Sequence, residues 1–160
     1  MDDTPAPLSN INIWPGPYIR RLQQIAVALF TEETQRWTLT PVQYGALLTV
    51  SRQPEVDQRT LAELIGLDTS TTAGVVDRLE ARGWLRRGAS PHDRRVKLLT
   101  PTAEGLALLA EVQPYAQRAQ QRILSPLSEI EQAEFMRLLR QLVHTHADTA
   151  QTPADGWMDE

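Results

Sequence analysis

The stretch from residue 57 to residue 105 constrains the fold of this chain more than any other part. A short helix is expected over Gln58–Ile65, and Gly66 should end it because glycine readily adopts the left-handed conformation that terminates helices. A second helix should run from Thr69 to about Arg82, with Asp68 or Thr69 as its N-cap. Two short helices joined by a brief turn that contains glycine are typical of a helix-turn-helix, which we place at 57–82.

The second of these helices has two different faces. Its apolar face has helical spacing and is expected to pack in the core; it consists of Thr72, Val75, Val76 and Leu79. The other face carries small side chains and a cation, which suits close approach to base edges in a DNA major groove. The candidate DNA-binding residues on it are Thr69, Ser70, Thr71, Ala73, Gly74 and Arg78. A core helix with a plain solvent face would show a similar pattern, so this helix alone leaves both interpretations open.

A β-hairpin is expected directly after the second helix, which makes it a wing over residues 84–99. From Arg78 to Lys97 there are seven basic residues and two acidic ones, a local net charge of +5, although the whole chain carries −4. A compact basic patch on an acidic protein is typical of a surface that binds duplex DNA rather than of a solvated hairpin. The candidate DNA-binding residues of the wing are Arg87, Arg94, Arg95 and Lys97.

Four segments of this region carry a family resemblance: residues 61–66, 76–85, 93–95 and 99–105. Together they resemble the multiple antibiotic resistance regulator (MarR) family of winged-helix transcription factors, and the likeness extends over about residues 16–145. The resemblance implies that Arg95 enters the minor groove while Asp93 helps to hold the wing. Pro101 departs from the family pattern, which usually has an apolar strand residue before the threonine, so the end of the second wing strand stays open.

The expected fold is mainly α with a small β wing, a winged helix-turn-helix lobe joined to a helical dimerisation region. We expect an N-terminal arm at 1–14, a single domain at 15–147 and a disordered tail at 148–160. Thr40 with Gln43, and Ser128 with Glu131, form capping boxes, and Thr102 is a further N-cap. The dimerisation helices are expected at 16–36, 103–124 and 129–146. Their expected buried positions include Leu106, Leu109, Val112, Ile123, Phe135, Leu138, Leu142 and Val143.

These flanking helices carry more apolar surface than a small winged lobe can bury, and dimerisation would cover the surplus. The resemblance likewise implies a homodimer in which both chain ends interlock. It also implies an effector, since members of the family often bind small aromatic or phenolic carboxylates between the dimer helices and the DNA-binding lobe.

Candidate effector-binding residues are Trp14, Tyr18, Arg21, Ile25, Tyr44 and Leu48. Arg21 could form two hydrogen bonds with a carboxylate while aromatic side chains contact the ring. Core or dimer packing is the alternative role for each of these residues. The segment 17–26 resembles a branch of the family that is associated with the catabolism of aromatic acids, pyridine carboxylates among them.

Enzymatic and metal-binding functions find little support in the sequence. His144 and His146 are two residues apart, so on a helix they point to different sides. There is no glycine-rich phosphate loop and no nucleophile motif, and we expect no catalytic residue, no metal and no cofactor. The chain has no cysteine, no apolar run of membrane-spanning length and no hydrophobic signal region, which predicts a cytoplasmic protein without a membrane partner.

These features predict a ligand-responsive, homodimeric repressor that binds a pseudo-palindromic operator in double-stranded DNA and is released by a small aromatic or phenolic carboxylate. One alternative is an architectural DNA-binding protein that responds to no ligand. Another is a winged-helix protein-interaction module that binds no DNA, against which the basic patch argues.

Overall fold

The computed structural model describes residues 14–93 and 95–146. Its elements are α1 (Pro15–Thr34), η2 (Gln35–Trp37), α2 (Pro41–Arg52), β1 (Val56–Asp57), α3 (Gln58–Ile65), α4 (Thr69–Ala81), β2 (Leu85–Ala89), β3 (Lys97–Pro101), α5 (Ala103–Leu124) and α6 (Glu129–Thr145). The expected class, mainly helical with a small wing, is confirmed. The predicted tail and all of the predicted arm except Trp14 lie outside the described residues.

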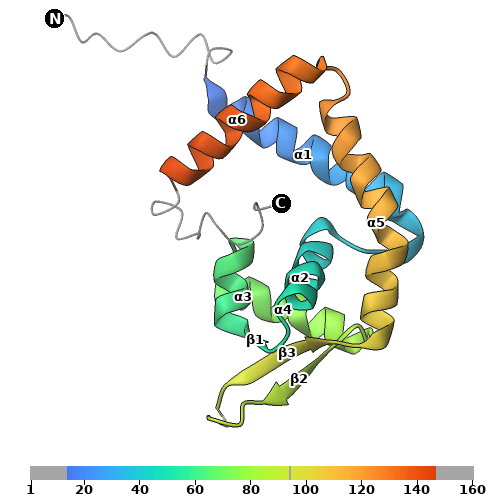
Figure 1. Cartoon of the computed structure of the whole chain (residues 1–160), viewed down its shortest axis with the longest axis vertical. Coiled ribbons are helices and arrows are strands. Elements are labelled where there is room, and N and C mark those ends of the chain that lie inside the picture. Colours follow the sequence, from blue (N-terminus) through green and yellow to red (C-terminus); the bar gives the residue numbers. More distant parts are fainter. Residues whose placement is uncertain (1–13, 94, 147–160) are drawn as a thin grey trace, which may run out of the picture.

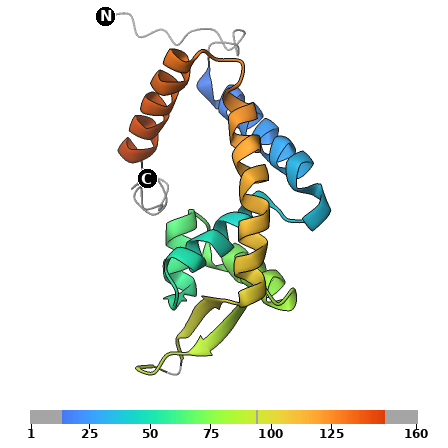
Figure 2. The same ribbon diagram turned by 45° about the vertical axis from the view of Figure 1, so that its right-hand side comes forward.

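Two halves of the molecule are visible in Figure 1. The winged lobe consists of α2, α3, α4 and the three strands. The helical half consists of α1, the C-terminal part of α5 and α6. Helix α5 belongs to both, because its first turns follow the wing and its last turns lie beside α1 (Figures 1 and 2). No helix among the described residues is both long enough and apolar enough to cross a bilayer.

Side-chain caps set the helix starts where the sequence predicts them. Thr40 and Gln43 form a reciprocal capping box at α2, and Ser128 and Glu131 form another at α6. The Thr102 hydroxyl accepts a hydrogen bond from the Gly105 N–H at the start of α5. Each cap satisfies backbone donors that the first turn of a helix leaves unpaired. These boundaries therefore follow from local chemistry.

The sheet has the strand order β1-β3-β2, and both pairings are antiparallel. Strand β1, which was not predicted, pairs Val56 with Leu99. Strand β3 continues beyond the predicted wing end to Pro101, which lies opposite Leu85. Proline is tolerated there because β1 does not extend to this position, so no strand needs its missing N–H.

One hydrophobic core fills the winged lobe. The predicted apolar face of α4 is buried, as are Leu109 and Val112 of α5. Leu106 was expected to be buried but is 48% exposed, and Ile123 is only partly buried. The largest fully buried apolar side chains come from four helices and two strands: Leu47, Val50, Leu61, Val76, Leu79, Leu85, Leu99 and Val112.

The helical half buries much less. Helix α1 buries Phe30 and Thr34, and α6 buries no residue. The expectation that α6 turns its apolar side chains inward is wrong for the single chain, because α6 bends back from α5 and stands apart from the winged lobe (Figure 2). Its residues Leu138, Leu142 and Val143 are exposed, and Phe135 is only partly buried.

Ion pairs fasten α1 to the C-terminal part of α5. Arg122 donates to Glu33 at 2.8 Å and to Glu32 at 3.1 Å, and Arg118 lies 3.3 Å from Glu33. Pro114 lies inside α5, between the turns that contact the winged lobe and the turns that carry these arginines. The two carboxylates on α1, which as neighbours on a helix could have been a solvated face, thus contribute to the packing of α1 on α5.

Gly105 offers a test of the junction between the wing and α5. A Cβ at this position would lie 1.9 Å from the carbonyl oxygen of Trp84. We expect Gly105→Ala to lower the free energy of unfolding by about 2–3 kcal/mol, because the backbone of one element must move. Urea unfolding followed by circular dichroism measures this.

Gly45 in α2 provides the matched control, since a Cβ there would meet nothing within 4 Å. Gly45→Ala should raise the free energy of unfolding by roughly 0.5–1 kcal/mol through helix propensity. Equal effects of the two substitutions would contradict the close contact between α5 and Trp84.

Candidate nucleic-acid interface

The helix-turn-helix is fixed by its turn. Gly66 ends α3 with φ of 69°, a left-handed conformation that costs glycine nothing. Asp57 caps α3, and Asp68 caps α4 by accepting from the Thr71 N–H at 2.8 Å. Hydrogen bonds from Thr60 hold the pKa of the Asp57 carboxyl below its usual value, and those from Thr71 do the same for Asp68. Both caps are therefore ionised at neutral pH.

The face of α4 opposite its buried stripe is open. Thr69, Ser70 and Thr71 are exposed in its first turn, and Arg78 is exposed in its last. The Thr71 hydroxyl donates to Asp68 at 2.6 Å, which leaves its oxygen as an acceptor. Ala73 and Gly74 are partly buried, and the Arg78 guanidinium lies over Gly74, 3.5 Å from where a Cβ would be. The predicted face is thus small, polar and accessible.

The tip of the wing is held by its own side chains. The Asp93 carboxylate accepts from the Arg95 N–H at 2.9 Å. The Ser90 hydroxyl accepts from the His92 and Asp93 N–H groups at 3.2 and 3.4 Å. Arg94 lies outside the described residues. These bonds fix the turn that carries Arg95 and leave its side chain exposed.

The basic residues counted from the sequence divide into two groups. Arg78, Arg95 and Lys97 are exposed and form no ion pair with any described residue. Arg82 and Arg86 have internal partners: Arg82 donates to the carbonyls of Trp37 and Thr38, and Arg86 donates to the Thr100 hydroxyl. Of the seven basic residues counted between Arg78 and Lys97, those available to a partner therefore lie on α4 and the wing. They are fewer than seven, because some of the arginines have partners within the chain.

Arg87 differs from its expected role as a DNA-contacting residue. Its guanidinium binds Asp77 and Glu80 of α4, each at 2.5 Å, and its own N–H donates to Glu80. Burial disfavours its charge, but hydrogen bonds to Asp77 and Glu80 outweigh burial and raise the pKa of Arg87. Arg87 therefore fastens the wing to α4 instead of presenting a free cation. No sequence signal indicated this pairing, because Asp77 and Glu80 lie ten and seven residues before Arg87 on a different element.

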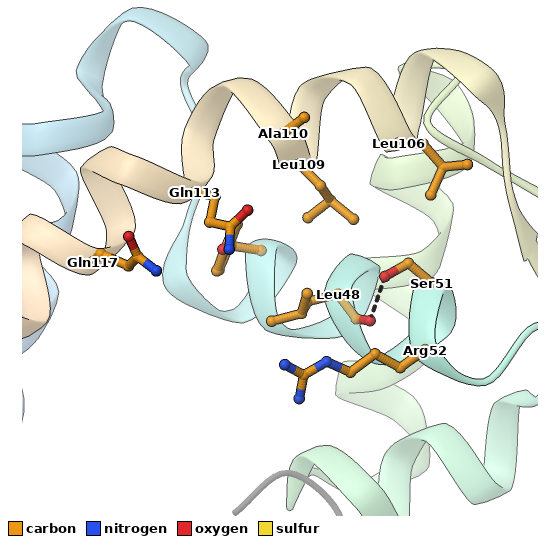
Figure 3. A pocket seen from close by; sticks show the side chains of 9 residues that line it. Leu48, Ser51, Arg52, Leu106, Leu109, Ala110, Gln113 and Gln117 are labelled. Carbon is orange, nitrogen blue, oxygen red and sulfur yellow. Dashed lines mark hydrogen bonds between the residues drawn. The ribbon is translucent and has the colours of Figure 1, made fainter. Parts of the chain in front are cut away.

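A cavity of about 390 Å³ lies between α2 and α5 (Figure 3). Its polar side chains are Tyr44, Ser51 and Arg52 of α2 and two glutamines of α5. The full lining is Tyr44, Leu48, Ser51, Arg52, Leu106, Leu109, Ala110, Gln113 and Gln117. Burial raises the pKa of the Tyr44 hydroxyl, and the charge of Arg52 opposes this shift. Tyr44 is therefore a neutral hydrogen-bonding group at neutral pH.

Only Tyr44 and Leu48 of the six predicted effector-binding residues line this cavity. The other four lie on α1 or at its start with exposed side chains: Trp14, Tyr18, Arg21 and Ile25. Arg21 donates to Gln24 of the same helix. Sequence reasoning missed Arg52, which has no ion pair or hydrogen bond among the described residues. Its position eight residues after Tyr44 on one helix was an available signal.

No group of three or more His, Asp or Glu side chains in residues 14–93 and 95–146 is arranged to hold a metal ion. Because α4 displays an open polar face and the hairpin after it carries unpaired cations, the fold and the site define a winged helix-turn-helix DNA-binding protein.

Comparison with known sequences agrees. The sequence model of the MarR family matches residues 37–96. The chain is 33% identical over 121 residues to the transcriptional regulator HosA of Escherichia coli O111:H-, covering 72% of this chain and 90% of the relative. It is 32% identical over 135 residues to a putative regulatory protein for the hcr operon of Thauera aromatica, covering 84% of this chain and 81% of the relative. The chain belongs to the MarR family of transcriptional regulators.

Solved structures of transcriptional regulators are also similar to this chain. The PcaV regulator of Streptomyces coelicolor is similar with a TM-score of 0.73 and 38% identity, over 84% of this chain and 98% of that one. BpsR of Bordetella bronchiseptica has a TM-score of 0.78 and 30% identity over 82% and 94%. The repressor CouR, solved on a 23-mer DNA duplex, has a TM-score of 0.78 and 26% identity over 84% and 96%.

The ion pairs of Arg87 predict a stability effect. Arg87→Ala should lower the free energy of unfolding by about 1 kcal/mol, because two charge-assisted bonds between α4 and the wing are lost in a partly solvated site. The control is Arg59→Ala, which removes an exposed i,i+4 pair with Glu63 and should cost below about 0.5 kcal/mol. Urea unfolding compares the two, and an Arg87 effect no larger than that of Arg59 would contradict the fastening role.

Proposed function

We propose that this protein is a homodimeric repressor that binds a pseudo-palindromic operator. The observation that carries the proposal is the open face of α4 beside unpaired wing cations. Thr69, Ser70, Thr71, Ala73 and Gly74 would lie against base edges in the major groove, where small side chains permit close approach. Arg95 would enter the adjacent minor groove, with Arg78, Arg94 and Lys97 near the phosphates.

The dimer is supported by the unburied surface of the helical half. Ten of the 13 exposed large hydrophobic side chains among the described residues belong to α1, its N-cap or α6: Trp14, Tyr18, Ile19, Ile25, Val27, Ile130, Leu138, Leu139, Leu142 and Val143. Monomeric proteins rarely expose contiguous apolar surface of this kind. A second copy of the chain would cover it and would place two recognition helices on one two-fold site.

We also propose that a small aromatic or phenolic carboxylate releases the repressor by binding between α2 and α5. The cavity volume falls within the range of about 300–1,000 Å³ that is usual for small-molecule sites. Arg52 supplies an uncompensated cation, Tyr44 a ring and a hydroxyl, and Leu48 with Leu109 an apolar wall. PcaV has been solved with its natural ligand, and the BpsR structure concerns regulation of DNA binding by 6-hydroxynicotinic acid.

The position of this cavity suggests how binding would act. One wall is α2, a core helix of the winged lobe, and the other is α5, which continues into the helical half. A ligand that prefers one separation of these helices shifts the population toward it. Since α5 of each protomer would lead to the dimer interface, a change in its angle changes the spacing of the two recognition helices. The four exposed candidates on α1 are then dimer contacts, with Arg21 outside the cavity.

Replacing Arg95 tests DNA binding by the wing. Arg95→Ala should weaken operator binding and make the slope of log K against log salt shallower by about one unit per protomer, because a cation in the minor groove that would displace counterions from the duplex is lost. Fluorescence anisotropy on a duplex footprinted in the upstream intergenic region, at several salt concentrations, measures both. Arg95→Lys keeps the charge and should keep the slope. An unchanged affinity and slope in Arg95→Ala would exclude the wing contact, and failure of the wild type to shift any upstream duplex would favour a protein-interaction module.

Arg52 tests the effector site. In Arg52→Ala the concentration of benzoate, 4-hydroxybenzoate or 6-hydroxynicotinic acid that releases half of the operator should rise at least about tenfold, since a charge-assisted pair is lost. The neutral amide nicotinamide should release wild type poorly. Arg21→Ala is the matched control and should respond like wild type. Loss of the response in Arg21→Ala but not in Arg52→Ala would move the site to α1, and no response of wild type to any acid would favour the architectural alternative.

A further inference from the structure

Arg82 contacts the connector between α1 and α2, far from it in sequence. This residue follows α4 directly and was counted among the basic residues of the wing region. Its guanidinium donates two hydrogen bonds of 2.9 Å, one to the carbonyl of Trp37 and one to the carbonyl of Thr38. It also stacks on the Trp84 ring, with 3.8 Å between its Cζ and the ring centroid. A flat guanidinium can make all three contacts at once, whereas an ammonium cannot.

The acceptors of these bonds lie in an unusual piece of backbone. Thr38 ends the short helix η2 with φ of 51° and ψ of 47°, a left-handed conformation that is rare for a β-branched residue. Such strain persists only where surrounding contacts enforce it. The terminal carbonyls of η2 carry partial negative charge, which a cation stabilises. The Arg82 fork therefore helps to hold the connector in a conformation that Thr38 would not adopt alone.

The connector is in turn attached to α5. The Trp37 indole N–H donates to Glu111 at 3.3 Å, and its ring contacts Tyr115 edge-on with centroids 4.9 Å apart. Arg36 covers both rings, with its Cζ 3.9 and 5.1 Å from their centroids. These contacts flank Pro114, the position in α5 between the winged lobe and the helical half.

The residues after Arg82 are fixed just as closely. The Gly83 carbonyl accepts from the Thr102 hydroxyl at 2.6 Å, and the Trp84 carbonyl accepts from the Thr102 N–H at 3.1 Å. The absence of a side chain at Gly105 permits this approach of α5 to Trp84. The C-terminal end of α4 is thus joined to α5 at two points. The residues after α4 contact the first turn of α5 directly, and Arg82 is linked through Trp37 to the middle of α5.

We propose that Arg82 is a positioning residue for DNA recognition: it fixes the orientation of α4 relative to α5, and so sets the spacing of the two recognition helices in the dimer. The inference rests on the proposed function, since spacing is defined only for a dimer on a two-fold site. Arg82 touches no DNA in this role. A dimer whose recognition helices are held rigidly discriminates strongly between correct and altered half-site spacing, because the altered site fits only after reorientation.

The experiment compares two duplexes, the footprinted operator and the same operator with one base pair inserted between its half-sites. The quantity measured is the ratio of their dissociation constants, together with the salt slope on the first duplex, for the full-length protein. In Arg82→Ala the ratio should fall by about tenfold, the loss expected when charge-assisted bonds that orient α4 are removed, while the salt slope stays at the wild-type value. Arg82→Lys keeps the charge without the fork and should give an intermediate ratio.

Arg95→Ala is the control, since it should weaken both duplexes alike and change the slope without changing the ratio. Where Arg82→Ala does not fold, as judged by circular dichroism, Arg82→Lys carries the test. A folded variant with a lower melting temperature and an unchanged ratio would overturn the inference and leave Arg82 as a stabilising residue only. A wild type that binds neither duplex would instead overturn the proposed function, and the inference with it.

Discussion

The burial of one stripe of α4 is the constraint on which the interface depends. Thr72, Val75, Val76 and Leu79 pack among α2, α3 and the sheet, and with helical periodicity this leaves one direction for the remaining face. That face is the small, polar one. The orientation is reinforced at both ends, by the Asp68 cap at the start and by the contacts of Arg82 at the finish. The core and these two end contacts together fix the direction of the exposed face of α4.

Electrostatics then separates arginines that build the structure from cations that remain available. Arg87 joins the wing to α4, and Arg118 with Arg122 joins α5 to α1. Each of these is compensated by carboxylates. Among the described residues, cations whose side chains form no ion pair, hydrogen bond or ring contact lie on α4 and the wing, namely Arg78, Arg95 and Lys97. Three others lie elsewhere: Arg52 in the cavity between α2 and α5, Arg20 on α1 and Arg140 on α6. The proposed DNA-binding residues and the residues that line the cavity do not overlap. Under the proposed function, a ligand in the cavity would therefore influence DNA binding through the positions of the helices.

Local chemistry made much of this fold predictable. The limits of α3 and α5, the capping boxes at Thr40 and Ser128, and the buried face of α4 all follow from residues close in sequence. What could not be predicted depends on distant partners. Strand β1 is two residues long and exists only because β3 pairs with it. Charge counting could not reveal that Arg82 and Arg87 have internal partners, and apolar spacing on α6 could not indicate that its own chain leaves it uncovered. The spacing of Tyr44 and Arg52 places them on one side of α2, but only the packing of α5 beside α2 makes that side a cavity wall.

The most direct test of the account asks where α4 lies on DNA. The chain has no cysteine, so Ser70→Cys provides a single attachment point for a tethered iron–EDTA reagent on the exposed face of α4. Cleavage of the operator should form two clusters in the major grooves, one in each half-site, about one helical turn of 10–10.5 base pairs apart. Ala133→Cys on α6 should give no localised cleavage. Equal cleavage from the two positions, or none from Ser70→Cys on a bound duplex, would contradict the assignment of α4 as the recognition helix.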